Sequence, residues 1–323
     1  MNTFGTIFKV SIFGESHGAQ VGVVIDGCPA GTPLCLSDFE TDLKRRKSGA
    51  KGTTPRIEAD EPEIVSGVFN GFTTGTPITI LFKNSNTHSS DYSNLVTHPR
   101  PGHADFTGSC KYNGFNDYRG GGHFSARITV GIVAAGVVAK KILSGVDIKS
   151  TILEVGGDVN IEAAVAKAME QHDSVGGIVD CRVNGLPVGL GEPFWDSVES
   201  MISHAVFAIP AVKGIEFGCG FEAAKMVGSQ HNDNIIDIDG TTETNNAGGI
   251  NGGITNGNEL YFKIAVKPTA SIAIEQQTFN FETKNIEPLR VKGRHDACVA
   301  LRVPPILEAM TAIVLADLML VKQ

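Results

Sequence analysis

A short segment near the N-terminus presents a histidine that could transfer protons. Residues 13–18 read FGESHG, so a short β-like run leads into a turn that carries Ser16 and His17 between two glycines. Histidine exchanges its proton closer to neutral pH than any other side chain, which suits general acid–base catalysis. A lone turn histidine is commonly structural, so this segment by itself leaves both roles open.

A second loop combines three side chains of complementary chemistry. Residues 98–105 read HPRPGHAD, in which two prolines and a glycine fix an irregular loop that carries Arg100, His103 and Asp105. Loops positioned by a rigid scaffold often hold binding and catalytic residues, although a rigid surface turn has the same composition. The segment is therefore a candidate active-site loop.

A run of glycines precedes a long apolar segment. Residues 117–127 read DYRGGGHFSAR, and three glycines at the start of a helix let backbone N–H groups point at an anion, with Arg119 and Arg127 alongside. The run is neither G-x-G-x-x-G nor a Walker P-loop, which argues against a Rossmann dinucleotide site and a nucleotide hydrolase. Taken alone, it indicates only a close approach of the backbone.

Three later segments combine tight turns with polar side chains. Residues 247–253 read AGGINGG and residues 267–271 read KPTAS; together they could hold a phosphate and the polar edge of a ring system, or simply close two hairpins. Residues 292–298 read KGRHDAC. There, Arg294 and Asp296 either pair with each other or act separately, one as a substrate-binding cation and the other in proton transfer.

Helices must position these loops. Small and apolar residues from Ser125 to Leu143 predict a long helix that is buried on all sides, and residues 304–322 predict another that begins with two prolines. Ser37-Asp38-Phe39-Glu40 has the spacing of a capping box and predicts a helix to about Lys47, whose last turn is basic. Residues 160–171 and 192–208 predict two more helices.

Short β-rich runs lie between the helices without the regular alternation of a doubly wound sheet. They are Gly22–Ile25, Ile64–Val68, Ile78–Phe82, Ile178–Val183, Ile215–Phe217 and Glu259–Val266. No Pro/Ser-rich linker divides the chain. We therefore predict one α+β domain over residues 1–323, in which apolar helices pack under or between antiparallel β-sheets.

Composition narrows the functional classes. A formal net charge of −8 argues against a general polyanion binder, so an anionic ligand must be held by a local cluster of cations. Six scattered cysteines without metal-finger spacing suggest reduced thiols in a cytoplasmic protein. The longest apolar run, Val130–Ala139, is shorter than the roughly 20 residues that a membrane helix needs. We expect a soluble protein with no metal and no nucleic-acid or membrane partner.

The motifs are specific when they are taken together and in order. Ser-His, R-P-G-H-A-D, D-Y-R-G-G-G-x-x-S-A-R, A-G-G-I-x-G-G, K-P-T-x-S and G-R-H-D span nearly the whole chain, which resembles the chorismate synthase family. The resemblance implies an anti-1,4-elimination of phosphate from 5-enolpyruvylshikimate 3-phosphate to give chorismate, which requires reduced FMN without net redox change. It also implies a homotetramer whose helices lie between antiparallel sheets.

The resemblance further implies residue roles. His17 would protonate the reduced flavin, His103 would protonate the departing phosphate, and Asp296, near Ser125, would take part in removing the ring proton. The substrate would be bound by Ser16, Arg46, Arg100, Arg127 and Arg294. FMN would contact His123, Phe124, Ser125, Pro210, Ala211, Gly252, Lys267, Pro268, Thr269, Ala270, Ser271 and Arg294.

The chain departs from the family pattern in two places. After the triple glycine, many relatives carry Arg-Ser or Arg-Ala where this chain has His123-Phe124, and Lys51 stands where relatives usually place a further arginine. Two other functions remain as alternatives. One is a flavin-dependent oxidoreductase with net electron transfer, and the other is an anion- or RNA-binding module using residues 44–51 and Arg56. An external flavin reductase is a further expected partner.

Overall fold

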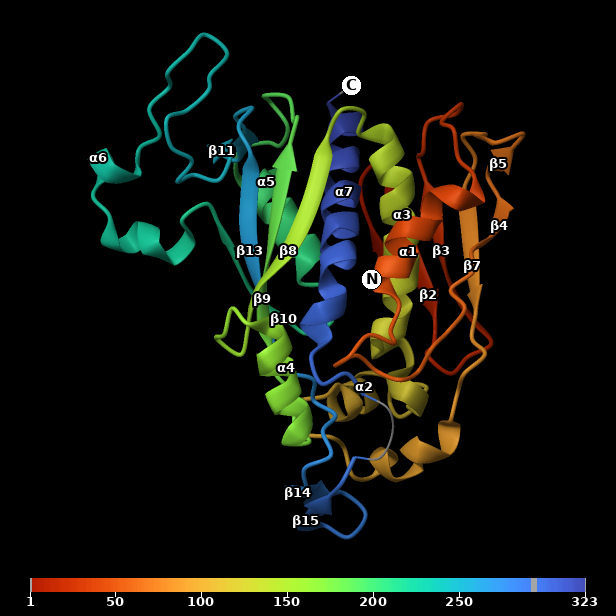
Figure 1. Cartoon of the computed structure of the whole chain (residues 1–323). Coiled ribbons are helices and arrows are strands. Elements are labelled where there is room, and N and C mark those ends of the chain that lie inside the picture. Colours follow the sequence, from red (N-terminus) through yellow and green to blue (C-terminus); the bar gives the residue numbers. More distant parts are fainter. Residues whose placement is uncertain (1, 292–294, 323) are drawn as a thin grey trace.

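Two antiparallel β-sheets enclose a layer of helices in the computed structural model, which describes residues 2–291 and 295–322 (Figure 1). The N-terminal sheet has the order β1-β2-β3-β7-β4, with strands Thr3–Phe4, Lys9–Gly14, Gln20–Asp26, Ile78–Lys83 and Glu63–Ser66. The second sheet has the order β10-β13-β9-β8, with strands Val212–Phe217, Leu260–Val266, Gly177–Asn184 and Asp147–Val155. All of these pairings are antiparallel, which confirms the predicted α+β class.

Two apolar helices form the centre of the middle layer, α3 (Thr129–Ile142) and α7 (Val303–Val321), flanked by α1 (Glu40–Arg46) and α5 (Val198–Val206) (Figure 1). Helix α7 is buried from Val303 to Leu318 because it contacts helices on one side and strands β8 and β9 on the other. By length and composition the segment Val299–Val321 could span a membrane, so the expectation that no run is long enough was wrong. Its burial inside the protein identifies it as a core helix.

Helices α3 and α7 approach each other closely at a glycine. A Cβ atom at Gly136 would overlap the backbone and Cβ of Ala309 on α7. Small residues at such a crossing let the two backbones come together, and the sheets can then pack against both outer faces. The small side chains between residues 125 and 143 thus allow this helix to be buried on all sides, as its sequence predicted.

Two buried carboxylates fix α7 to its neighbours. Asp317 accepts hydrogen bonds from three successive backbone N–H groups, of Thr6, Ile7 and Phe8, at 2.7–2.8 Å. One turn after the start of the helix, Glu308 accepts a bidentate pair from Arg45 at 2.6 and 2.7 Å and the backbone N–H of Ser150 at 3.0 Å. These contacts tie the N-terminal sheet, α1 and β8 to a single helix, and so set the position of the loops at its N-terminal end.

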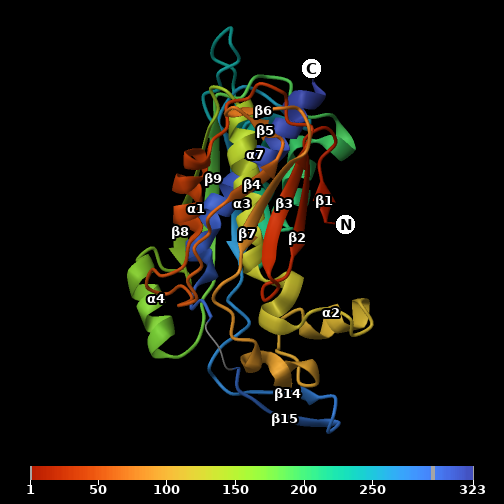
Figure 2. The same ribbon diagram turned by 90° about the vertical axis from the view of Figure 1, so that its right-hand side faces the viewer.

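A smaller layer of loops and short helices lies below the sandwich (Figure 2). It contains α2 (Asp105–Lys111), the hairpin β14–β15 (Gln276–Asn280 and Asn285–Leu289) and the 3-10 helices Ser89–Val96 and Arg119–Phe124. Leu95, Leu289 and Val291 form a second small apolar cluster there. The remaining elements are β5 (Val68–Phe69), β6 (Phe72–Thr73), α4 (Ile161–Glu170), α6 (Gly228–His231), β11 (Ile250–Asn251), β12 (Ile254–Thr255) and the 3-10 helices Leu36–Phe39, Ala126–Ile128, Phe194–Asp196, Gly220–Lys225 and Val299–Arg302.

The predicted capping box at residues 37–40 was wrong in its register. Asp38 reaches back to the backbone N–H of Cys35 at 2.8 Å, so Cys35 is the N-cap and a 3-10 turn precedes α1. The long helix predicted from Ser125 begins with a 3-10 turn in which the Ser125 hydroxyl accepts the N–H of Arg127. Strand β8 was absent from the predicted strands; most of its outward-facing side chains are polar, and only Ile148 and Val155 are fully buried.

Candidate active site

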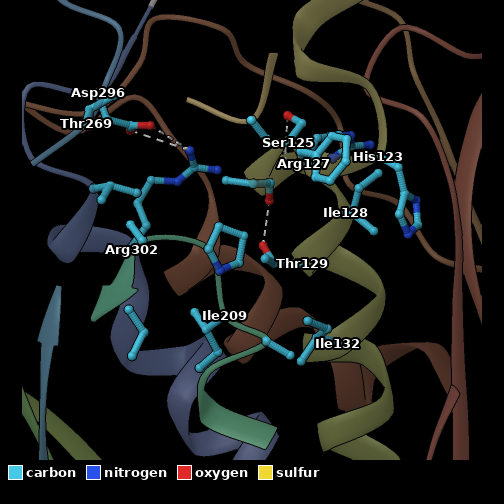
Figure 3. A pocket seen from close by; sticks show the side chains of 18 of the residues that line it. His123, Ser125, Arg127, Ile128, Thr129, Ile132, Ile209, Thr269, Asp296 and Arg302 are labelled. Carbon is cyan, nitrogen blue, oxygen red and sulfur yellow. Dashed lines mark hydrogen bonds and ion pairs between the residues drawn. The ribbon is translucent and has the colours of Figure 1, made fainter. Parts of the chain in front are cut away.

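A cavity of about 700 Å³ lies at the N-terminal ends of α3 and α7, a size typical of small-molecule sites. It receives side chains from segments far apart in the sequence, namely the loops after α1, β13 and α5 and the start of both central helices (Figure 3). One end is charged. The other is apolar, and its walls include Ile128, Ile132, Ile209, Met310 and Ile313.

Two buried arginines at the charged end share one carboxylate. Arg46 donates to Asp60 Oδ2 at 2.7 Å, and Arg127 pairs with Asp60 Oδ1; all three side chains are nearly inaccessible. Burial, and then the neighbouring Arg302 and Arg127, lower the pKa of Arg46 to about 10 despite the attraction of Asp60. The Arg46 Nε has no hydrogen-bond partner although it is buried in the cavity wall. This excess of positive charge suits an anion.

The three side chains predicted for the candidate active-site loop, Arg100, His103 and Asp105, contact one another. Arg100 donates to Asp105 through Nε and Nη2, each at 2.7 Å, and to the Ser271 hydroxyl at 2.9 Å. His103 Nδ1 lies 2.6 Å from Asp105 Oδ1. Burial opposes ionisation of Asp105, but its hydrogen bonds to Arg100 and His103 prevail and hold the pKa of Asp105 well below its usual range. Because Asp105 fixes Nδ1, the His103 Nε2 is the nitrogen left for a ligand.

The triple glycine lets two loops meet. Gly120, Gly121 and Gly122 all have positive φ, and a Cβ at Gly120 would overlap the ring of His17 and the hydroxyl of Ser16. The sequence had suggested an anion site flanked by Arg119, but Arg119 pairs with Asp117 and does not line the cavity. The glycines therefore bring the Ser16–His17 turn close, while Gly120 itself lines the cavity.

Ser16 and His17 lie directly behind that wall and do not themselves line the cavity. The buried Ser16 hydroxyl accepts a hydrogen bond from Arg56 Nη1 at 2.7 Å, and the His17 ring meets Tyr92 edge to face with centroids 5.3 Å apart. Burial, followed by the charge of Arg56, lowers the pKa of His17. The histidine is thus a neighbour of the cavity, one residue layer away.

The Asp296 carboxylate closes the cavity beside the start of α7. It accepts the backbone N–H of Thr54 at 2.9 Å and faces Arg302 Nη1 at 3.4 Å (Figure 3). Arg302 also donates to the Arg46 carbonyl at 3.1 Å. Asp296 therefore pairs with an arginine that sequence analysis did not single out, while Arg294 lies outside the described residues.

The 267–271 segment forms another wall. Lys267 Nζ donates to the Gly102 carbonyl at 2.6 Å, and its backbone N–H donates to Ala211, a residue with the unusual φ of 73°. The buried hydroxyl of Thr269 has no hydrogen-bond partner. The predicted cofactor residues of this wall that line the cavity are Pro210, Ala211, Lys267, Pro268, Thr269, Ala270 and Ser271.

The remaining predicted cofactor residues fall into two groups. His123, Phe124 and Ser125 line the cavity, although His123 Nδ1 is 2.8 Å from the Gly14 carbonyl and the Phe124 ring packs against Gly108. Gly252 does not line it: it occupies the turn between β11 and β12, at the other end of the second sheet (Figure 1). Within one chain, Gly252 is therefore not brought to the other residues.

Two charged side chains, Glu58 and Asp60, were missed although the sequence carried a signal, and Arg56 was named only for an anion- or RNA-binding module. Arg56, Glu58 and Asp60 are all turned inward, whereas Ile57 between the first two is exposed. Alternation of period two marks one face of extended chain, so this charged face implied an interior lined by ions. Among residues 2–291 and 295–322, no group of three or more His, Cys, Asp and Glu could hold a metal ion, and all six cysteines are free.

Comparison with known proteins identifies relatives over the whole chain. A family model described as chorismate synthase matches residues 8–320. The chain is 62% identical over 324 residues to a chorismate synthase of Chitinophaga pinensis, covering 100% of this chain and 98% of the relative, and 48% identical to one of Dehalococcoides mccartyi, covering 99% and 96%. A solved structure described as a crystal structure of chorismate synthase superposes with a TM-score of 0.75 at 26% identity, covering 99% of this chain and 93% of the other.

Proposed function

The chain belongs to the chorismate synthase family, and we propose that this cavity performs the family reaction, elimination of phosphate from 5-enolpyruvylshikimate 3-phosphate to give chorismate. The observation that carries the proposal is the pair of buried arginines, Arg46 and Arg127, on the single carboxylate of Asp60. The substrate has two carboxylates and a phosphate. Two buried guanidinium groups, one of which has an N–H without a hydrogen-bond partner (Arg46 Nε), can bind such an anion.

Arg46, Arg100 and Arg127 are the proposed substrate-binding cations, with Arg294 assisting, whereas Ser16 lies behind the cavity wall and could act only through its hydrogen bond to Arg56. Arg100 is held rigidly by Asp105 and Ser271, so its orientation is set before any ligand arrives. Preorganised donors stabilise developing charge without reorganisation at the moment of reaction. We therefore assign the departing phosphate to the end of the cavity between Arg100 and the Arg46–Arg127 pair.

His103 is the proposed general acid. Asp105 holds Nδ1, which leaves Nε2 to donate a proton to the phosphate as its bond to the ring carbon breaks. Asp296 and Ser125, which both line the cavity, are the proposed groups for removal of the ring proton, and His17 is proposed to exchange a proton with the flavin from behind Gly120. These roles follow the family resemblance; His103, Ser125 and Asp296 line the cavity, whereas His17 lies one residue layer behind its wall.

Reduced FMN is the proposed cofactor. The unpaired buried hydroxyl of Thr269, the ammonium of Lys267 and the apolar walls around Ile132 and Ile209 fit a ligand with a polar phosphate tail and a flat apolar ring. When bound, the reduced flavin supplies electron density beside the ring from which phosphate leaves. His123, Phe124, Pro210, Ala211 and the rest of the 267–271 segment would also contact it, and Gly252 could do so only from a second copy of the chain.

An anaerobic assay tests the function. Phosphate release from 5-enolpyruvylshikimate 3-phosphate is measured with reduced FMN, with oxidised FMN and without flavin. We expect release only with reduced FMN, and a flavin spectrum that is still reduced after many turnovers. Release that consumes one reduced flavin for each turnover would instead favour a flavin-dependent oxidoreductase.

We also propose a homotetramer in the cytoplasm, supplied with reduced FMN by a separate reductase. Support for self-association comes from exposed apolar side chains on the long connection between β10 and β13 and on the segment before α5. They are Trp195, Phe221, Ile235, Ile236 and Ile238. Groups of this kind on a soluble protein often mark interfaces. Light scattering after size-exclusion chromatography would give the mass, and a monomer would remove this part of the proposal.

A further inference from the structure

Arg56 connects the cavity to the Ser16–His17 turn. Its Nη1 donates to the Ser16 hydroxyl at 2.7 Å and its Nη2 to the Ser16 carbonyl at 2.8 Å. The side chain is only 15% exposed, and Arg56 lines the cavity while Ser16 does not. A planar guanidinium can hold both oxygens of one residue in a fixed relation, which an ammonium cannot do.

Glu58 holds this arginine from the other side. Its Oε1 accepts from Arg56 Nε at 3.1 Å and Nη2 at 2.8 Å, and its Oε2 accepts the backbone N–H of Ser85 at 2.8 Å. The carboxylate is almost fully buried. Arg56 is thus held between the Glu58 carboxylate and the Ser16 turn. The orientation of its guanidinium therefore affects the position of the next residue, His17.

The neighbours of His17 make its position sensitive to the contacts of Arg56 with Glu58 and Ser16. The ring is wedged between Gly120 and Tyr92, and the ionised groups that affect it are Arg56, Glu58, Asp117 and Arg119. Arg56 is the largest charge effect among these and disfavours the protonated ring. Both the position and the titration of His17 therefore depend on Arg56.

We propose that Arg56 is a positioning residue, which, braced by Glu58, fixes the Ser16–His17 turn against the glycine loop at the cavity wall. This inference rests on the proposed function, in which His17 exchanges a proton. It adds Arg56 and Glu58 to the working site through their effect on the position of His17. It also explains why a charged segment, residues 56–60, is folded inward.

The test compares Arg56→Lys, Arg56→Gln and Glu58→Gln with Arg119→Gln as a matched control. Arg119 also lies near His17, but it is paired with Asp117 and has no contact with Ser16. The ring of His17 is followed by NMR titration after selective histidine labelling, with its signal assigned from His17→Asn. Phosphate release gives kcat and KM under reduced FMN.

Arg56→Lys should keep the His17 pKa below its ordinary 6.5 but lower kcat by about 10- to 100-fold, because charge is kept and geometry is lost. Arg56→Gln should lower kcat similarly and raise the His17 pKa. Glu58→Gln should lower kcat less, and Arg119→Gln should leave it unchanged. Wild-type kcat in Arg56→Lys, or an increase in KM alone, would overturn the proposal. Full turnover by His17→Asn would instead remove the role of His17, and the NMR titration would still report whether Arg56 controls that ring.

Discussion

Replacing Asp60 with Asn would remove one charge from the most buried ionic cluster of the site. Asp60 has φ 52°, a left-handed conformation that Asn tolerates as readily as Asp, so the backbone should not change. The side chains have nearly the same shape. Asp60→Asn therefore isolates the effect of the negative charge that Arg46 and Arg127 share.

The expected cost is large because nothing else in the cluster can compensate. Breaking a buried ion pair by removing one partner costs about 3–5 kcal/mol, since a desolvated charge is left without a counterion. Here the side chains of Arg46 and Arg127 are 2% and 5% exposed, so solvent cannot replace the carboxylate. We expect Asp60→Asn to lower the free energy of unfolding by about 3–5 kcal/mol.

Urea unfolding at several pH values provides the assay. Burial opposes the charge on Asp60, but Arg46 and Arg127 prevail and lower its pKa. A lowered pKa means that the stabilisation is complete above the pKa of the unfolded carboxyl, about 4, and is lost as the pH falls through the lower folded value. The difference between wild type and variant should therefore be constant from about pH 8 to pH 5 and shrink below about pH 4.

Asp117→Asn is the matched control, because Asp117 pairs with the largely exposed Arg119. Such a pair contributes about 0–1 kcal/mol. If Asp60→Asn costs no more than Asp117→Asn, the shared carboxylate does not hold the arginines in place. A difference that persists unchanged at pH 3 would also contradict the reasoning, because it would come from shape and not from charge.

Three further substitutions test other parts of the site and fold. His103→Ala should lower the rate of anaerobic phosphate release by about 10²–10⁴ with folding intact, and an unchanged rate would exclude it as the general acid. Thr269→Val replaces an unpaired buried hydroxyl with a methyl group, so it should weaken reduced FMN binding in a titration by about 2- to 10-fold without loss of stability. Gly136→Ala should lower the free energy of unfolding in urea by about 1–3 kcal/mol through overlap with Ala309; wild-type stability would show that the helices can separate there.

The central helices could be predicted from the sequence because their signal is local. Segments that become α3 and α7 are apolar on every side, and no surface helix has that composition. The strand order could not be predicted in the same way. Strand β7 pairs between β3 and β4, and β13 inserts between β9 and β10, so each neighbour depends on packing between distant segments. Local patterns show that a strand exists, and only tertiary contacts decide its partner.

The candidate site likewise contains residues that the local sequence predicted and residues that it could not predict. His103 and Arg100 stood out because prolines and glycine mark their loop, and the structure brings both to the cavity with Arg46 and Arg127. Arg302 did not stand out because it precedes an apolar helix, where a single cation is unremarkable. Whether Arg302 faces Asp296 or solvent depends on how the 47–54 loop meets the start of α7, which no short-range pattern records.

The charge pattern of the cavity suggests how a site for a highly anionic substrate can also release its products. Its buried or half-buried arginines are each held by a carboxylate, and five arginines share four acids: Arg46 and Arg127 with Asp60, Arg56 with Glu58, Arg100 with Asp105, and Arg302 with Asp296. Without these acids, the guanidiniums would repel one another in a low-dielectric space and the free cavity would be costly to fold. With them, the five arginines and four acids carry a net charge of only +1, to which Lys47 and Lys267 in the cavity wall add. Recognition then comes from fixed donor geometry as well as from this remaining charge, and phosphate, once released from carbon, meets guanidinium groups that each already have a carboxylate partner and can let it go.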